Sequence, residues 1–341
     1  MTAFTTADIL LPRLTAEGMS KWAVVACDQY TGEPEYWEKV REIVGRAPSA
    51  LDLILPEAYL DEPNCEEHIA KIHENMTNYL KNDLFNVYND CFILTTRTQA
   101  DGRLRVGLVG AIDLEMYDYN KGSKSQVRAT EATVAERIPP RVKIRMNAPL
   151  ELPHIMILID DVQNTVIEPL LEKKLQTVYD FELMQNGGHL KGSVVDGDSA
   201  REVLAALDKL ADKNTFNRRY GLQNEDVLLY AMGDGNHSLA TAKECYEQKK
   251  RTNSPDAELA RYALVEVVNL HSPALEFEAI HRVITEVDTD DLMCKMTNSL
   301  GLTEDGEQKF SVVLGDKTRE FGITKPTSNL TVGSLQTFLD D

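Results

Sequence analysis

The sequence predicts a mixed α/β fold, with helices packed on a largely mixed sheet. Short apolar runs, typical of buried strands, alternate along the 341 residues with stretches whose apolar residues recur every three or four positions. The alternation is irregular and lacks a clean βαβ period, which is why we expect a mixed sheet. The hydrophobic content of 43% is ordinary for a globular protein and too high for a disordered one.

The first part of the chain shows both kinds of pattern. Strands are predicted at Trp22–Asp28, which would deliver Asp28 to a loop, and at Leu51–Leu55. Helical spacing occurs over Glu35–Val44 and Cys65–Leu80. A hairpin is expected around Asp101-Gly102, between strands at Phe92–Thr96 and Leu104–Leu114.

The second part continues the alternation. The predicted strands are His154–Asp160, Val178–Leu183, Leu190–Val195, Val227–Met232, Ala263–Leu270 and Phe310–Leu314. The predicted helices are Val166–Lys174, Ser199–Leu210, Leu239–Gln248, Asp290–Leu300 and Leu330–Leu339.

The segment between Met116 and Asn147 has a different character. Charged residues and turn formers dominate it, and Pro139-Pro140 is expected to break any helix passing through. We therefore place a boundary near this segment, between an N-terminal portion, 1–125, and a C-terminal portion, 126–341. One continuous unit is the alternative, because no long Gly/Ser/Pro linker marks the division.

Charge and composition exclude several classes of protein. The 36 Lys and Arg against 55 Asp and Glu give a net charge of −19, which argues against general nucleic-acid binding. No apolar run reaches the roughly 18 residues of a membrane helix. The first residues lack the pattern of a signal peptide, and the five scattered cysteines include no Cys-x-x-Cys pair. We expect a cytoplasmic protein and leave its oligomeric state open.

The sharpest local feature is Gly233-Asp-Gly-Asn-His-Ser238, which follows an apolar run and opens a helix. Glycines let the backbone approach a ligand, and a helix N-terminus attracts anions. Asp234 is useful beside a phosphate if it holds Mg²⁺ or activates a hydroxyl. The alternative is that Asp234, Asn236 or Ser238 merely caps the helix. The phosphate contacts would come from Gly233, Gly235, Asn236, His237 and Ser238.

Two further segments carry candidate chemistry. Arg128 and Arg141 belong to a concentration of basic residues in an acidic chain and could clamp phosphates, while Glu131 could bind a cation. A solvated charged surface is the alternative for that segment. Asp28 and Glu33 flank the loop before a predicted helix, where carboxylates either act in catalysis or simply favour the helix N-terminus.

Four segments together resemble the bacterial family known as domain of unknown function 1015. They are Trp22–Thr31 with Glu33–Trp37, Val127–Thr133, Asp234–His237 and His281-Arg282, and the resemblance extends from about Ile9 to Asp340. The loop of that family usually reads Ala-Asp-Gly-His-His-Arg, so Asn236 and Ser238 here replace its first histidine and its arginine. Longer members continue beyond Leu339.

The Asp-Gly-Asn-His loop, with its strand and helix, is also similar to the phosphate-binding element of the ParB/sulfiredoxin-like fold, a superfamily that includes nucleotide-binding partition proteins. That resemblance implies that the residues from Gly235 to Ser238 lie against a nucleotide's phosphates. A DNA-bound partition factor is disfavoured by the acidic charge.

The first functional hypothesis is an enzyme that uses a nucleotide and Mg²⁺ to transfer a phosphoryl group to a small hydroxyl substrate. Arg128 and Arg141 would neutralise charge, and Glu131 or Asp234 would hold the metal. The acceptor hydroxyl would be oriented by Asp28 or Glu33, with His237 as another candidate base. The alternative hypothesis is a non-catalytic nucleotide- or anion-sensing protein. A metal-dependent hydrolase would need a tighter His/Asp cluster.

Overall fold

The computed structural model describes residues 2–60, 62–131, 138–276 and 281–340. The chain divides into two compact units, Met1–Leu275 and Glu276–Asp341, and each has its own sheet. Residue 126, where the sequence suggested a boundary, lies inside the first unit. It falls between β5 (Tyr117–Asp118) and β6 (Val127–Arg128), which pair with each other in parallel.

The first unit is built on a mixed sheet, so the predicted mixed α/β class is confirmed. Within the described residues its path runs β5, β6, β10 (Tyr230–Asp234), β7 (Ile155–Ile159), β11 (Tyr262–Asn269), β4 (Leu104–Asp113), β3 (Phe85–Thr98), β9 (His189–Val195) and β8 (Gln176–Glu182). Two short strands join its side, β1 (Phe4–Thr5) on β4 and β2 (Ala7–Pro12) on β3. Parallel pairs occur at β5/β6, β6/β10 and β7/β11, and the other pairs are antiparallel.

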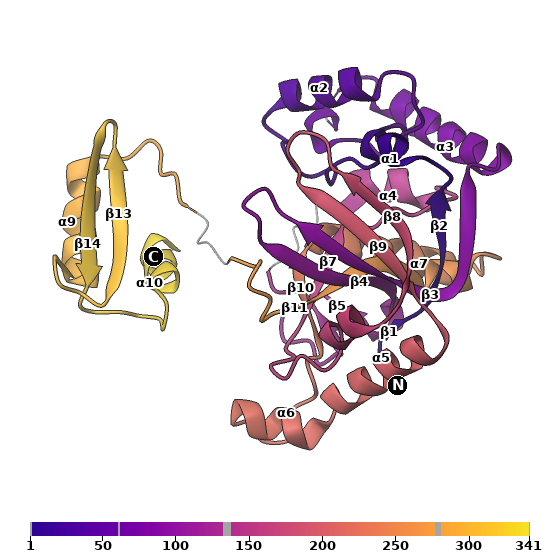
Figure 1. The fold of residues 1–341 in the computed structure, drawn as a ribbon. Helices are drawn as coiled ribbons and strands as arrows, with labels where there is room; N and C mark the ends of the chain where they lie inside the picture. The colour runs from indigo at the N-terminus through magenta and orange to yellow at the C-terminus, as the bar shows by residue number, and fades with distance from the viewer. Residues whose placement is uncertain (1, 61, 132–137, 277–280, 341) are drawn as a thin grey trace. The chain divides into compact units, whose positions relative to one another are not determined.

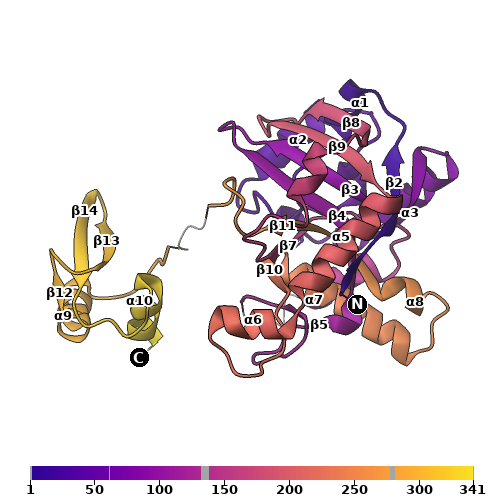
Figure 2. The ribbon, with the colours of Figure 1, turned by 60° about the horizontal axis from the view of Figure 1, so that its bottom comes forward.

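One face of this sheet carries the main core. Apolar residues of α5 (Gly197–Leu210) and α7 (Asn236–Arg251) pack there, including Val203, Leu207 and Leu239, against strand residues such as Ile157 and Val265. Figure 2 shows α5 lying across the strands. Helix α4 (Ile138–Met146) packs on α7. The C-terminal half of this unit also contains α6 (Lys213–Tyr220) and α8 (Ala257–Ala260).

The helices α1 (Ala16–Trp22), α2 (Pro34–Val44) and α3 (Cys65–Lys81) gather on another side of the sheet, away from α5 and α6 (Figure 1). The α2 residues Trp37 and Val40 pack on Leu51, and α3 packs through Ile69 and Ile72 against Leu53 and Leu55. These apolar positions recur at helical spacing, which explains why both helices were predictable. None of the described helices is long and apolar enough to cross a membrane.

The second unit contains α9 (Thr289–Leu300), α10 (Thr331–Asp340) and a three-stranded antiparallel sheet. The strand order is β12 (Leu302–Thr303), β14 (Lys317–Ile323) and β13 (Gln308–Leu314). Its core is formed by Met296, Leu300 and Ile323, with Leu335 and Phe338 of α10 packed against them.

Two predicted strands have a different structure. Trp22 ends α1, and residues 23–28 continue as irregular chain in which Val24 and Val25 bury their side chains against α2 rather than beside another strand. Leu51–Leu55 begins as a short 3₁₀ helix, η1 (Ala50–Leu53), after Ser49 caps it by accepting a hydrogen bond from the Leu51 N–H. Burial made both runs apolar, and burial alone does not select strand geometry.

One helix prediction also needs correction, and another concerns a helix whose start is only partly described. Pro139 and Pro140 lie at the start of the described part of α4, and in the first turn of a helix a missing backbone N–H costs no intrahelical hydrogen bond. Whether they break a longer helix depends on residues 132–137, which lie outside the described residues. The helix predicted over Val166–Lys174 is only a 3₁₀ segment, η5 (Glu168–Glu172). Two other 3₁₀ segments are η2 (Glu57–Tyr59) and η3 (Leu114–Met116).

Candidate functional site

The loop between β10 and α7 leads directly into the N-terminus of α7. Gly235 is the N-cap residue, with φ +81°, and no side chain among the described residues caps the helix. A Cβ at Gly235 would lie 3.2 Å from the Ile155 Cα, so the tight turn and the neighbouring strand both favour glycine. Among the described residues, then, no side-chain hydrogen bond of the kind expected from a capping residue is seen at Gly235. A helix N-terminus also favours an anion.

The end of β10 is shaped so that Asp234 turns away from the core. The register of β10 against β7 shifts between Met232 and Asp234, at Gly233. Such an irregularity locally bends a strand and changes the direction of the following side chain. The Gly235 N–H donates to Oδ1 of Asp234 at 2.8 Å, which fixes the carboxylate beside the start of α7.

The carboxylate of Asp234 is close to two others that come from distant segments. Partial removal from water raises the pKa of Asp234, and the negative charges of Asp28 and Glu131 raise it further. The Gly235 N–H and His154 act in the opposite direction. Asp28 is half-buried, and its Oδ1 is enclosed with no hydrogen-bond partner in the described part of the chain. Asp28 and Glu131 therefore both lie near Asp234.

Asn236 links Glu131 to the helix. Its side chain is 5% exposed, and its Nδ2 donates to Oε1 of Glu131 at 3.1 Å. Its Oδ1 has no partner among the described residues. A buried amide oxygen without a partner is costly, so this atom is suited to a donor or cation that arrives with a ligand. Residues 132–137, which follow Glu131 and complete its motif, lie outside the described residues.

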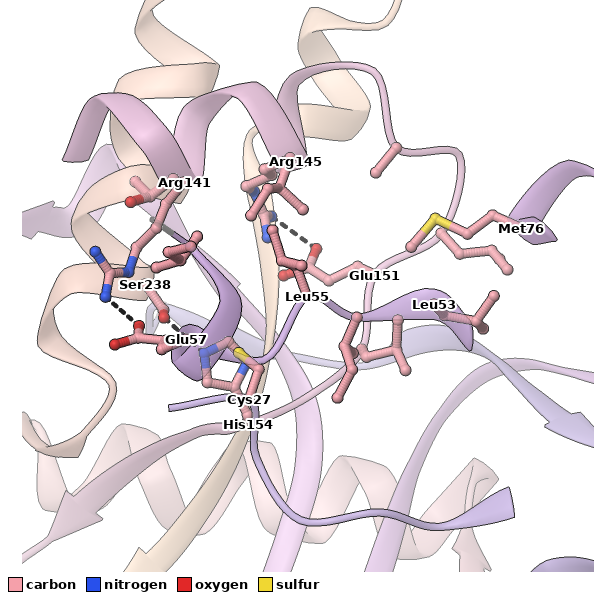
Figure 3. Close-up of a pocket in the computed structure, with 17 residues that line it drawn as sticks. Cys27, Leu53, Leu55, Glu57, Met76, Arg141, Arg145, Glu151, His154 and Ser238 are labelled. Atoms are coloured by element: carbon pink, nitrogen blue, oxygen red, sulfur yellow. Dashed lines mark hydrogen bonds and ion pairs between the residues drawn. The ribbon is translucent and has the colours of Figure 1, made fainter. Parts of the chain in front are cut away.

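His154 and Ser238 form a second contact at the same helix end. His154 precedes β7, and its Nε2 lies 2.6 Å from Oγ of Ser238 (Figure 3). Sequence alone does not mark His154 as a site residue, because a single histidine before an apolar strand carries no local signal. His237, also in the first turn, is half-buried, and its backbone carbonyl accepts a hydrogen bond from the Thr241 hydroxyl.

The two predicted arginines have different positions. Arg141, on α4, forms a partly buried ion pair with Glu57, and both side chains face the same cavity as Ser238 (Figure 3). Arg128 instead donates to the backbone carbonyls of Ser125 and Asp226. Asp226 precedes β10, whereas α7 follows the far end of that strand, so the Arg128 guanidinium is held away from the α7 N-terminus.

Glu33 and Cys27 do not extend the set of reactive groups. Glu33 is exposed at the N-cap of α2 and is not among the described residues that line either cavity at this site. Burial raises the pKa of Cys27 to about 12, and the carboxylates of Asp28 and Glu57 add to this shift. A thiol held in its neutral form is a poor nucleophile.

Two cavities adjoin at His154. The smaller one, of about 140 Å³, is mostly apolar and also contains Arg141 and Ser238. The larger one, of about 680 Å³, has Asp234 in its wall and extends between the α1–α2 segment and the sheet. His154 and Cys27 line both. The larger volume lies within the usual range for small-molecule sites.

The donor set does not form a ready metal cage. Within the described ranges no group of three or more His, Cys, Asp or Glu side chains is arranged to hold a metal ion. Mg²⁺ is usually bound by one or two carboxylates together with substrate phosphates and water. Asp234 and Glu131, with the unpartnered amide oxygen of Asn236, fit that mode of binding, in which phosphate oxygens and water complete the coordination of the ion.

Comparison with known proteins places the whole chain in a family. Neither the search of curated proteins nor the search of solved structures gave a match. The family model described as "Protein of unknown function (DUF1015)" matches residues 12–340 and so covers both structural units. This chain belongs to that family.

Proposed function

We propose that the protein binds a nucleotide together with Mg²⁺ at the N-terminus of α7 and transfers a phosphoryl group to a small hydroxyl compound in the larger cavity. The observation that carries the proposal is the proximity of Asp28 and Glu131 to Asp234, at the N-terminus of α7 and beside a cavity of about 680 Å³ that Asp234 lines.

In this proposal the N-terminus of α7 binds phosphate, and the carboxylates bind Mg²⁺. The first-turn N–H groups attract phosphate oxygens, but each such interaction contributes only about 0.3–1 kcal/mol when it is exposed to solvent. The carboxylates alone would repel a phosphate. Mg²⁺ supplies the missing neutralisation of charge on the phosphates. Asp234 and Glu131 provide the oxygen ligands for it, and the buried Asn236 amide orients Glu131.

Asp28 is the carboxylate best placed to receive the proton of the acceptor. Its enclosed Oδ1 lacks a partner in the described part of the chain, and it lies between Cys27 and Gln29, which line the larger cavity. Glu33 is exposed, and neither of its sequence neighbours lines that cavity. In the transfer, the acceptor hydroxyl oxygen forms a bond to the terminal phosphorus of a nucleoside triphosphate, and its proton passes to Asp28. The bond from that phosphorus to the bridging oxygen breaks, and a nucleoside diphosphate leaves.

The experiment is a turnover assay with purified protein, ATP, Mg²⁺ and a panel of small hydroxyl compounds, followed by ADP release. We expect hydroxyl-dependent ADP release that Asp28→Asn abolishes. Glu33→Gln is the matched control, because it removes the other carboxylate that the sequence left open, and it should retain the rate. Equal loss in both variants, or no ADP release from any compound, would contradict the transfer reaction.

Nucleotide or anion sensing without chemistry is the second candidate. It is favoured by one observation, that the described residues hold no preassembled group of three metal-ligating side chains. A thermal-shift screen with and without Mg²⁺ separates the two functions. A ligand that binds only the native state adds about 2.7 kcal/mol at a hundredfold excess over its Kd. Sensing predicts this stabilisation without turnover.

A further inference from the structure

Two arginines face each other on the wall of the larger cavity. Arg97 on β3 and Arg105 on β4 are directly opposed in the antiparallel register, and both line the cavity. Like charges in directly opposed positions destabilise a sheet. Such a pair is unexpected in a chain with a net charge of −19, where most of the described arginines form an ion pair with a carboxylate.

The partners that are present do not neutralise the pair. Arg97 donates through Nε and Nη2 to the backbone carbonyl of Gly187, at 3.2 and 2.9 Å, and this acceptor carries no formal charge. Arg105 donates through Nη2 to Oε2 of Glu266 at 3.0 Å. Burial lowers the pKa of Arg97, and the adjacent Arg105 charge lowers it further. The two guanidinium groups thus share one carboxylate.

Glu266 has little capacity to serve both arginines. Its Oε1 accepts a hydrogen bond from the Thr95 hydroxyl at 2.7 Å, while Oε2 is paired with Arg105. Its side chain lies over Gly107, where an added Cβ would approach Oε1 to 2.2 Å. The carboxylate is therefore held on the Arg105 side by its neighbours.

Further donors around this wall lack acceptors. The Nε of Arg105 and the Nε2 of Gln185 are enclosed without hydrogen-bond partners in the described ranges. Gln185 lies in the β8–β9 turn, which also lines the cavity. An excess of positive charge and of donors, with a deficit of acceptors, is the composition of a site for an oxyanion.

We infer that Arg97 and Arg105 form a binding site for the carboxylate or phosphate group of a small ligand. Because Asp234 and His154 line the same cavity, and resting on the proposed function, the phosphoryl acceptor is then a hydroxyl compound that carries an anionic group. Arginine forks bind carboxylates and phosphates bidentately, so this end of the cavity would orient the acceptor and the carboxylate end would act on its hydroxyl.

The test uses three probes that share hydroxyl groups and differ in charge, namely glycerol, glycerate and glycerol 3-phosphate, with inorganic phosphate as a fourth. Binding to the full-length protein is measured by calorimetry without nucleotide. We expect at least one anionic probe to bind and glycerol not to bind. The preferred anion identifies the group as carboxylate or phosphate.

Two variants should change this affinity in opposite directions. Arg97→Gln removes an anion partner and should weaken binding about tenfold or more, and Arg97→Lys should lose less. Glu266→Gln removes the competing carboxylate, keeps an acceptor for Thr95, and should strengthen binding about fivefold. Arg201→Gln, an exposed arginine on α5, is the control and should bind as the unmodified protein does.

Each outcome bears on the inference separately from the proposed function. Anion binding that depends on Arg97, without any nucleotide turnover, would support the site and overturn the transfer reaction. Turnover with glycerol that is unchanged in Arg97→Gln would support the reaction and overturn the site. Absence of binding by all anionic probes, or weaker binding in both Arg97→Gln and Glu266→Gln, would also overturn the site.

Discussion

His154 and Ser238 are 84 residues apart in the chain, and their side chains lie 2.6 Å apart between Nε2 and Oγ. The contact joins the residue that precedes β7 to the first turn of α7. It also places one imidazole in the walls of both cavities. The position of the α7 N-terminus relative to the sheet therefore depends partly on a polar contact between these two elements.

A double-mutant cycle measures that contact. We expect Ser238→Ala and His154→Ala each to lower the free energy of unfolding, and the double variant to lose less than their sum. A net hydrogen bond of this kind contributes about 0.5–1.5 kcal/mol, which sets the expected coupling energy. Urea denaturation of the four proteins provides the measurement. Strict additivity would show that the two side chains do not interact in solution.

Gly235→Ala should destabilise the protein through both backbone strain and a close contact. A left-handed backbone costs a non-glycine residue about 1–2 kcal/mol, and the new Cβ would lie 3.2 Å from the Ile155 Cα. Gly221→Ala is the matched control, because Gly221 also has a positive φ but has open space around its Cβ position. In thermal or urea unfolding, Gly235→Ala should lose about 1 kcal/mol more free energy of unfolding than Gly221→Ala. Equal losses would show that the Ile155 contact relaxes easily.

The raised pKa of Asp234 predicts a stability effect with a defined sign. Because its folded-state pKa lies above the ordinary 3.8, ionisation of Asp234 disfavours the folded state as pH rises through these two values. Asp234→Asn should therefore be more stable than the unmodified protein at pH 7, and its advantage should shrink as pH falls toward 3.8. Unfolding measured between pH 4 and 7 tests this. A less stable variant at pH 7 would contradict the crowding of negative charge.

Cys27 should resist alkylation despite lining both cavities. With a pKa of about 12, only about one thiol in ten thousand is ionised at pH 8. Cys294 is exposed and is the internal comparison. We expect iodoacetamide at pH 8 to label Cys294 and leave Cys27 unmodified, as read by peptide mass spectrometry. Rapid labelling of Cys27 would show that its surroundings stabilise the thiolate.

The parts of the fold that sequence predicted have strong local patterns. The helices α2, α3 and α9 have regular apolar spacing, and the hairpin at Asp101-Gly102 has a distinctive turn. The prediction of a strand at Trp22–Asp28 was wrong because the apolar side chains there pack against a neighbouring helix and not beside another strand. The effect of Pro139-Pro140 depends on where the helix begins, which tertiary packing decides, so sequence alone could not place the start of α4.

Some residues of the candidate site could likewise be predicted from local sequence, and others could not. Asp28 lies in a turn and Asp234 ends β10 beside two glycines, and these local residues mark both positions, so sequence could select them. His154 and the Arg97–Arg105 pair have no such mark, because their roles arise from strand pairing and from the contact with α7. Arg128 belonged to a conspicuous basic segment, yet backbone carbonyls hold its guanidinium elsewhere.

Calorimetric titration of ATP, with and without Mg²⁺, into the unmodified protein, Asp234→Asn and Asp198→Asn tests the central claim most directly. Asp198 is an exposed carboxylate on α5 and serves as the control. We predict that Mg²⁺ tightens ATP binding in the unmodified protein and in Asp198→Asn, and that Asp234→Asn loses this dependence. Two results would contradict a cation-assisted phosphate site at the start of α7. One is that, with Mg²⁺ present, Asp234→Asn binds ATP as tightly as the unmodified protein does. The other is that the unmodified protein does not bind ATP.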